Sequence, residues 1–343
     1  MEAKIRALKA EKNAVVMAHN YQPLDIQALA DVVGDSLELA VKAKETGADL
    51  IVVCGVRFMA ETAKILNPDR KVVIPVEDAG CPLADFLTPD LIREAKERYP
   101  DAAVVVYVNS TAESKALADI TCTSANAVRV VMSLPNETIL FGPDANLAAY
   151  VQRELPKKTI VPVPPGGHCY VHTGFTLADV EAARRKGGTV VCHPECLPEV
   201  QEQADVIAST GGMVRGAAGA GEPWSVFTER DMVSRLRVLY PGRVFYEKPE
   251  AICVDMKKIS PADLQRALEC EEHEIILPPG VMDRARRALD LRRDGSLSTS
   301  ASRSASAPPT AGQSPRERSS STSTALPGRS SSWSGRRSTS SGG

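Results

Sequence analysis

The stretch RKVVIPVEDAGC at 70–81 recurs twice along the chain, as KKTIVPVPPGGHC at 157–169 and as GRVFYEKPEAIC at 242–253. In each copy a basic residue precedes a short apolar run, a loop with Pro or Gly follows, and a cysteine ends the loop. Successive cysteines lie 88 and 84 residues apart, and they are Cys81, Cys169 and Cys253. This spacing predicts a triplicated chain that places one thiol at the same structural position in each copy.

Polar residues at the ends of three further apolar runs keep the same period. The runs are AVVMAHNY at 14–21, AVVVYVNS at 103–110 and GTVVCHPE at 188–195. Such runs are typical of buried parallel strands, so their last residues belong at the carboxyl ends of strands, where α/β sheets bind ligands. The polar residues found there are His19, Tyr21, Tyr107, Asn109, His193 and Glu195.

A third periodic set consists of hydroxyl residues at expected loop-to-helix entries. Its members are Ser36, Ser124 and Thr210, which lie 88 and 86 residues apart. A hydroxyl at such a position caps a helix, and the N–H groups beside it can also bind an anion. One such residue is usually only a cap, but three that share the period of the cysteines indicate a common site.

Strand-like and helix-like segments alternate in every copy. This alternation predicts an α/β fold of three similar three-layer αβα domains with parallel sheets around a pseudo-three-fold axis, with the site at the central junction. Residues 27–47 and 197–211 are each expected to form a single helix. The expected domains are 1–84, 85–171 and 172–256, followed by a C-terminal helical segment at 257–294 that packs back on the core and a tail at 295–343.

Three thiols that meet near such an axis suit a metal centre with one position left open for substrate. Zinc sites usually draw ligands from close pairs such as CxxC, which this sequence lacks, so the long separations favour an iron–sulfur cluster. One alternative is a zinc-dependent hydrolase or lyase that uses Cys192, His193 and Cys196. Another is a cluster-bearing sensor or electron carrier, although such proteins normally add a fourth ligand and no fourth cysteine keeps the period.

His193 and Glu195 follow one strand and form a candidate acid–base pair. Glu195 is the expected general base, and Tyr21 is the expected proton donor or relay. His172 is expected either to donate to a phosphate or carboxylate group or to bond to the ligands of the metal centre.

The composition is that of an ordinary globular protein. The 343 residues are 43% hydrophobic and 24% charged, and the net charge of −2 indicates neither a nucleic-acid nor a membrane partner. No signal peptide is visible, so the protein is expected in the cytosol, where its eight cysteines stay reduced. Residues 295–343 contain 18 Ser and six Arg against one Glu, which predicts a disordered appendage or a frameshifted gene end, with an RNA-binding arm as the alternative.

Taken together, the motifs resemble those of quinolinate synthase, the A protein of bacterial NAD biosynthesis. The matching pieces run in order from residue 18 to about residue 258, and the resemblance extends to the closing helix near residue 290. They are AHNYQ, GDS, GCPLADF, YVNS, CTSANA, FGPDANLAAYV, HCYVHTGF, CHPEC, STGGM and CVDMKK.

The resemblance implies a concrete function. Members of this family are built from three similar α/β domains and condense iminoaspartate with dihydroxyacetone phosphate to quinolinate, phosphate and two waters. It implies a 4Fe–4S cluster held by Cys81, Cys169 and Cys253, with one open iron as Lewis acid. Tyr21, Glu195 and His193 correspond to acid–base residues. The implied substrate-binding residues are His19, Ser36, Tyr107, Asn109, Ser124, His193, Glu195 and Thr210.

The resemblance also implies partners and exposes two departures. Iminoaspartate would come from an L-aspartate oxidase or an aspartate dehydrogenase. The family usually has Gly where this chain has Asp231, so a different turn is expected there. The Ser-rich tail is foreign to the family.

Overall fold

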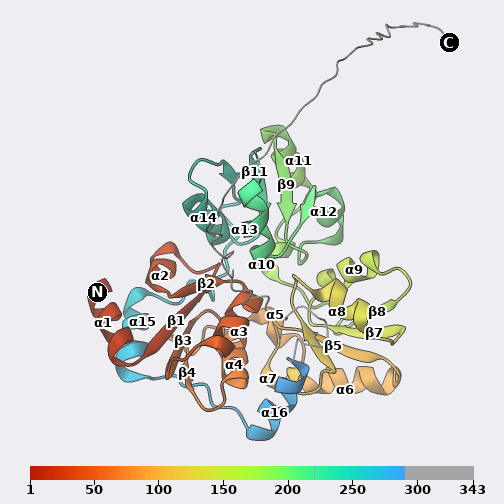
Figure 1. Cartoon of the computed structure of the whole chain (residues 1–343). Coiled ribbons are helices and arrows are strands. Elements are labelled where there is room, and N and C mark those ends of the chain that lie inside the picture. Colours follow the sequence, from red (N-terminus) through yellow and green to blue (C-terminus); the bar gives the residue numbers. More distant parts are fainter. Residues whose placement is uncertain (220, 290–343) are drawn as a thin grey trace, which may run out of the picture. The chain divides into compact units, whose positions relative to one another are not determined.

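Three parallel sheets of four strands each form the framework of the chain (Figure 1). The computed structural model describes residues 1–219 and 221–289, except for the side chain of Leu37, so the tail expected at 295–343 lies outside the described residues. In every sheet the strands are ordered second, first, third and fourth along the chain. This repeated order confirms the predicted α/β fold in three similar repeats, whereas the domain boundaries stay predictions.

The strands are short, and the first strand of each sheet pairs with both the second and the third. The first sheet contains β1 to β4, which are Ala14–His19, Val32–Gly34, Leu50–Cys54 and Lys71–Val73. The second contains β5 to β8, which are Ala103–Tyr107, Ile120–Cys122, Thr138–Gly142 and Thr159–Pro162. The third contains β9 to β12, which are Thr189–Cys192, Val206–Ile207, Trp224–Phe227 and Phe245–Tyr246.

Helices connect the strands in the same sequence in each repeat. The first repeat has α1 to α5, which are Glu2–Glu11, Leu24–Leu29, Ser36–Glu45, Arg57–Leu66 and Pro82–Asp85. The second has α6 to α10, which are Pro89–Arg98, Ala112–Lys115, Ala127–Ser133, Ala145–Glu154 and Tyr170–Thr173. The third has α11 to α14, which are Leu177–Lys186, Pro198–Gln203, Thr210–Gly219 and Arg230–Leu239, and α15 and α16 follow as Pro261–Cys270 and Pro279–Ala288.

The expectation of single helices at 27–47 and 197–211 is wrong, because a short edge strand interrupts each of them. These strands are β2 and β10, and both follow an aspartate. The Asp31 carboxylate accepts the N–H of Val16 at 2.8 Å, and the Asp31 N–H donates to the Val16 carbonyl at 2.8 Å. This paired bond draws the chain out of the helix and onto the sheet.

The same aspartate bond recurs in the other two repeats. Asp119 binds Val104 and Asp205 binds Val190, in each case through both the carboxylate and the backbone N–H. The three aspartates recur at nearly the same interval as the cysteines, and each fixes one edge strand of its own sheet.

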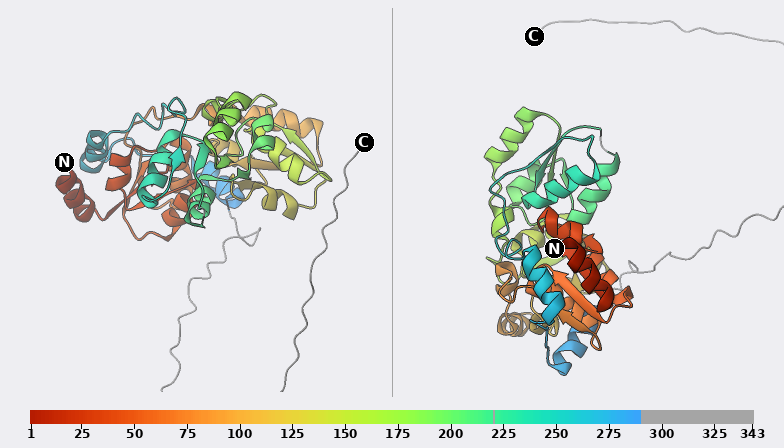
Figure 2. Two further views of the ribbon diagram at one scale, coloured as in Figure 1. Left: turned by 90° about the horizontal axis from the view of Figure 1, so that it is seen from above. Right: turned by 90° about the vertical axis from the view of Figure 1, so that its left-hand side faces the viewer.

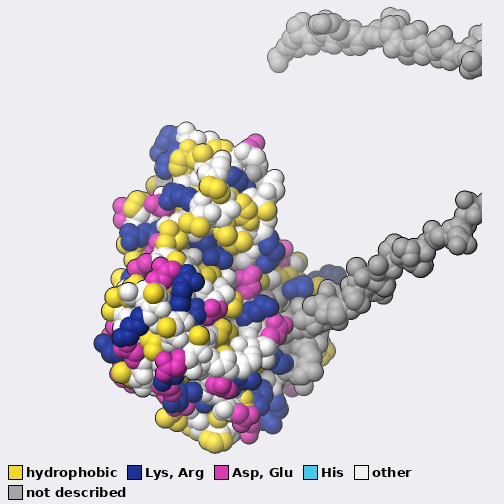
Figure 3. All heavy atoms as spheres, turned by 60° about the vertical axis from the view of Figure 1, so that its left-hand side comes forward, with side chains coloured by type: hydrophobic (Ala, Val, Ile, Leu, Met, Phe, Trp, Pro, Cys, Tyr) yellow, Lys and Arg dark blue, Asp and Glu magenta, His cyan; other side chains and the backbone are white. Residues whose placement is uncertain are grey.

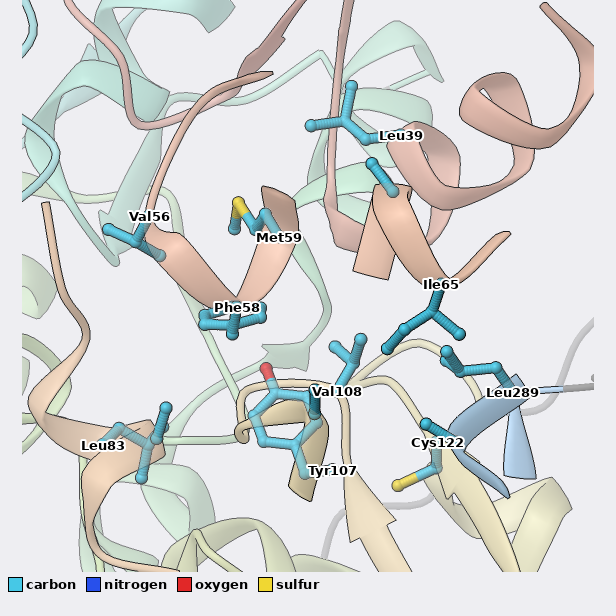
Figure 4. Close-up of a cluster of buried hydrophobic side chains, with 14 of the residues drawn as sticks. Leu39, Val56, Phe58, Met59, Ile65, Leu83, Tyr107, Val108, Cys122 and Leu289 are labelled. Atoms are coloured by element: carbon cyan, nitrogen blue, oxygen red, sulfur yellow. The ribbon is translucent and has the colours of Figure 1, made fainter. Parts of the chain in front are cut away.

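The first two repeats share one apolar core. Phe58 and Met59 of α4 belong to the same buried cluster as Tyr107 and Val108 at the end of β5 (Figure 4). Leu289, which follows α16, joins this cluster from the C-terminal segment. At the other side of the first sheet, α1 and α15 lie side by side (Figure 2). Two further clusters belong to the third repeat.

Three equivalent side chains join each repeat to the one before it and also hold the loop that follows its first strand. Gln27 of α2 donates to the carbonyls of Asn20 and Gln22 at 3.2 and 2.7 Å, and its Oε1 accepts from Arg235 of α14 at 3.3 Å. The amide of Gln201, in α12, repeats this pattern. It donates to the carbonyls of Pro194 and Cys196 at 2.8 and 2.7 Å and accepts from Arg153 of α9 at 3.0 Å.

These three contacts between repeats are the joints of the fold. The joint between the first and second repeats contains charged side chains. Lys115, at the position of the two glutamines, is fully buried and donates to the Ser110 carbonyl. Its ammonium lies 5.5 Å from the centre of the Phe58 ring and interacts with the Glu61 carboxylate of α4. Glu61 in turn accepts the N–H of Ala112 at 2.9 Å and pairs with Arg57 at 3.2 Å. A buried cation that interacts with a nearby carboxylate thus replaces a neutral amide at one of the three joints.

Charges of both signs are interspersed over the face shown in Figure 3. None of the helices within residues 1–219 and 221–289 combines the length and the apolar character needed to cross a bilayer.

We expect Lys115→Gln, which copies the residue of the other two joints, to lower the free energy of unfolding by about 1–3 kcal/mol, because the buried Glu61 carboxylate then keeps only the half-exposed Arg57 as a cation. The double variant Lys115→Gln/Glu61→Gln should be more stable than Lys115→Gln alone, since the buried carboxylate is then neutral. Thermal and denaturant unfolding measure both. A double variant that is less stable than the single one would contradict this account.

The same joint predicts a pH dependence. Burial lowers the pKa of Lys115 to about 8, although the Glu61 charge opposes the shift. Between pH 8 and 10.5 the unfolded chain still binds the proton that the folded chain has released, so the contribution of Lys115 to stability rises with pH in this window, by about 1–3 kcal/mol. The free energy of unfolding of the wild type minus that of the double variant should therefore rise across this range, because the buried thiols and phenols with raised pKa affect both proteins alike. Parallel curves would exclude this contribution.

Candidate active site

A cavity lies where the three repeats meet, and side chains from all of them line it. Every site residue predicted from the sequence lies in its wall. These residues are His19, Tyr21, Ser36, Cys81, Tyr107, Asn109, Ser124, Cys169, His193, Glu195, Thr210 and Cys253. The structure therefore brings together three sets that are spread over more than 230 residues of sequence, and their individual roles stay predictions.

Each of the three cysteines ends a loop immediately before a helical turn. Cys81 and Cys169 are the N-cap residues of α5 and α10, and Cys253 precedes a turn at residues 254–257. Their sulfurs accept backbone N–H groups of these turns, which come from Leu83 and Ala84 for Cys81, from His172 for Cys169 and from Met256 for Cys253. Such bonds stabilise a thiolate.

Burial raises the pKa of all three thiols, and their negative charges oppose one another. Without a positive partner the sulfurs therefore carry protons at neutral pH, and a metal would have to displace them. Among the described residues, the ligand atoms that lie within 4.8 Å of one another in a group of three belong to Cys169, His172 and Glu195, not to the three cysteines. Sulfurs on one tetrahedral zinc would be about 3.8 Å apart. The wider spacing suits a polynuclear cluster better.

The zinc alternative built on Cys192, His193 and Cys196 does not form in the structure. Cys192 and Cys196 are fully buried in an apolar cluster, where the two thiols contact each other and Cys196 approaches the Phe227 carbonyl at 3.6 Å. Within the described part of the chain, these three residues do not bring their ligand atoms to within 4.8 Å of one another. Both cysteines are packing residues.

A chain of short polar contacts connects the two tyrosines of the cavity. Tyr21 Oη lies 2.6 Å from Thr228 Oγ1, which lies 2.9 Å from His172 Nε2. His172 Nδ1 lies 2.9 Å from Glu195 Oε2, and Tyr107 donates to Glu195 Oε1 at 2.6 Å. The imidazole also stacks on the ring of His193, with 4.6 Å between the centroids. A proton can therefore pass between Tyr21 and the carboxylate without leaving side-chain atoms.

Glu195 is ionised in this environment. Burial alone would oppose the charge, but interactions with the imidazoles of His172 and His193 and hydrogen bonding from Tyr107 lower the pKa of Glu195 to about 2. Such a weak base needs a partner to take up a proton near pH 7. His172, which contacts it directly, is in the position to be that partner.

Two imidazoles and two phenols of the cavity are neutral near pH 7. Burial lowers the pKa of His19 and of His193 to about 3, and it raises the pKa of Tyr21 and Tyr107 well above their ordinary value. The two phenols keep their protons, while the two imidazoles are neutral donors or acceptors. Near pH 7 these four side chains thus offer neutral hydrogen-bonding groups beside Glu195, and Asp35 contributes a second carboxyl group to the wall.

The hydroxyl residues occupy three places around the cavity. Ser36 and Thr210 are the first residues of α3 and α13, whereas Ser124 lies three residues before α8. Ser124 Oγ contacts His193 Nε2 at 3.2 Å, and Thr210 Oγ1 accepts from Asn20 at 3.1 Å. The Asp35 carboxylate accepts N–H groups at the starts of both helices, from Glu38 at 2.9 Å and from Gly211 at 3.2 Å.

Sequence reasoning missed Thr228 and did not settle the role of His172. The residues that correspond to Thr228 in the other repeats are Gly55 and Pro143, one before the N-caps of the equivalent helices, so no polar period marks it. His172 follows Cys169 at the start of α10, and only the fold shows that its ring reaches Glu195.

The different turn expected at Asp231 is not present. Helix α14 begins at Arg230, and the carboxylate of its N-cap residue Glu229 accepts the N–H of Asp231 at 2.8 Å. Because residue 231 lies in the first helical turn, an L-residue fits there without strain.

Comparison with known proteins gives one consistent result. A family model described as quinolinate synthetase A protein matches residues 3–292. The quinolinate synthase of Pyrococcus furiosus is 52% identical over 293 residues, which cover 84% of this chain and 96% of the relative. Those of Methanocaldococcus jannaschii and Thermotoga maritima are 50% and 45% identical over 301 and 294 residues, covering 84% of this chain and 96% and 97% of the relatives. The matched region contains every residue of the cavity wall.

Proposed function

The chain belongs to the quinolinate synthetase A protein family, and on this premise we propose that it condenses iminoaspartate with dihydroxyacetone phosphate to quinolinate, phosphate and two waters. The observation that carries the proposal is the single cavity in which all three repeats contribute a cysteine, a polar strand end and a hydroxyl. Such a cavity suits a reaction that joins two anionic substrates.

The wall supplies groups that would bind these anions without repelling them. The neutral imidazoles of His19 and His193 would donate to carboxylate or phosphate oxygens, as would the hydroxyls of Ser36, Ser124 and Thr210. Asn109 Oδ1 is buried and has no partner within the described part of the chain. It would accept a hydrogen bond from a substrate amine or hydroxyl.

Cys81, Cys169 and Cys253 would hold a 4Fe–4S cluster. Their burial, their N–H bonds and their spacing fit such a group. When bound, it would supply one iron without a protein ligand as a Lewis acid for a substrate hydroxyl or carboxylate. Thiolate ligands need a reducing compartment, so we expect the enzyme to work in the cytosol.

Thr228, His172 and Glu195 would move protons during ring closure and dehydration. His172 Nδ1 lies 2.9 Å from Glu195 Oε2, so a proton on Nδ1 would face the carboxylate, and Nε2 would receive a further proton through Thr228 Oγ1. Tyr21, whose phenol stays protonated, would deliver a proton to a leaving hydroxyl and be recharged through Thr228. In this scheme Glu195 acts through His172 and is not itself the base.

Iminoaspartate hydrolyses readily, because it is an imine. An L-aspartate oxidase or an aspartate dehydrogenase would have to form it near the place of use. We propose such an enzyme as a functional partner.

Anaerobically purified protein should contain about four irons and four acid-labile sulfides per chain. Cys81→Ala, Cys169→Ala and Cys253→Ala should each lose this iron, because each removes one of three ligands, whereas Cys270→Ala should keep it, since Cys270 is exposed. Iron and sulfide analysis measures this. Full iron in any of the first three variants would overturn the ligand assignment.

Thr228→Val and Glu195→Gln should each reduce kcat for quinolinate formation at least about a hundredfold, the low end for an acid–base group, and should keep their iron. Because the two residues act through one imidazole, the double variant should lose little more than either single one. Thr159→Val, on an exposed strand position, is the control. Normal turnover of Thr228→Val would remove this residue from the mechanism.

A further inference from the structure

Tyr21 belongs to the first repeat, but residues beyond the second repeat hold both ends of it. Its phenol lies 2.6 Å from Thr228 Oγ1, and its backbone carbonyl accepts from the ammonium of Lys257. The Tyr21 N–H is also engaged, because it donates to His19 Nδ1 at 3.2 Å. The position of this tyrosine in the cavity therefore depends on contacts with residues that lie more than 200 positions away in sequence.

Lys257 is fixed by two carboxylates of the α14 N-terminus. Its Nζ lies 2.7 Å from Glu229 Oε1 and 2.5 Å from Asp231 Oδ2. The Glu229 side chain is fully buried, and only 18% of the Lys257 side chain is exposed. An ammonium held by two such partners has little freedom to leave the Tyr21 carbonyl.

Glu229 connects Thr228 to Lys257. It directly follows Thr228, and its Oε1 accepts the N–H of Cys253 at 3.4 Å. Bonds thus run from the Tyr21 phenol to Thr228, along the chain to Glu229, through its carboxylate to Lys257 and back to the Tyr21 carbonyl. The same carboxylate contacts the loop that carries one of the three cysteines.

We propose that Lys257, held by Glu229 and Asp231, is a positioning residue that sets the Tyr21 phenol against Thr228 and His172 and couples its place to the Cys253 loop. Only the kinetic test of this proposal depends on the proposed function. Lys257 touches no reacting atom in this scheme. It acts by keeping a proton donor in reaction geometry, where a misplacement of about 1 Å can cost about a hundredfold in rate.

The adjacent lysine provides a matched control. Lys258 forms ion pairs with Asp78 and Asp255 at 3.2 and 2.9 Å on the surface and makes no contact with Tyr21. Lys257→Met should lower kcat about tenfold to a hundredfold, with KM changed less than about threefold and the iron content unchanged. Lys257→Arg should restore most of the rate, because it keeps the charge, and Lys258→Met should behave as the wild type.

A second measurement tests the geometry without any assay of activity. In protein labelled with 3-fluorotyrosine, the 19F resonance of Tyr21 is identified by its loss in Tyr21→Phe. Lys257→Met should shift or broaden this resonance, while the resonance of Tyr240 at the end of α14 stays in place. Lys258→Met should change neither.

The outcomes separate the two proposals. If wild-type protein forms no quinolinate, the proposed function fails, and the 19F result alone then decides whether Lys257 positions Tyr21. An unchanged Tyr21 resonance in Lys257→Met overturns the inference. So does a loss of activity that follows a loss of iron, because Lys257 would then only support the Cys253 loop.

Discussion

The loops that carry the polar residues of the cavity are held in place by three side chains at one equivalent position. These side chains are Gln27, Lys115 and Gln201. Each donates to carbonyls in the loop after the first strand of its own repeat, and that loop carries the polar residues of the cavity. Each also contacts a helix of the preceding repeat. The site is therefore ordered by the closure of the ring of repeats and not by any repeat alone.

Much of this arrangement could be predicted from the sequence because it is repeated. A polar residue that recurs at a fixed period stands out against the composition, so the cysteines, strand ends and hydroxyls were found. Thr228 and Lys257 could not be found in this way, because each occurs in one repeat only. Their roles depend on contacts across the ring, which one chain without its fold does not reveal.

The prediction of a single helix at 27–47 was wrong for a local reason. The apolar residues around Val32 and Val33 also fit a helical pattern, and propensity cannot distinguish a three-residue strand from a helical turn. The decisive bond is that of Asp31 to Val16, fifteen residues earlier. Asp119 and Asp205 recur at the same period as Asp31, so the sequence did contain a signal for these edge strands. Aspartates are common at turns, however, and these three were not recognised as a periodic set.

The wide separation of the three cysteines has a consequence for biosynthesis. Cys253 follows Cys81 by 172 residues. At a synthesis rate of about 5–20 residues per second, the ribosome needs roughly 10–35 s to add the third thiol after the first. For the first half of this interval Cys81 is the only one of the three thiols that has been made, and Cys169 joins it for the second half. Assembly of the proposed centre would therefore follow translation of nearly the whole region that the three repeats occupy.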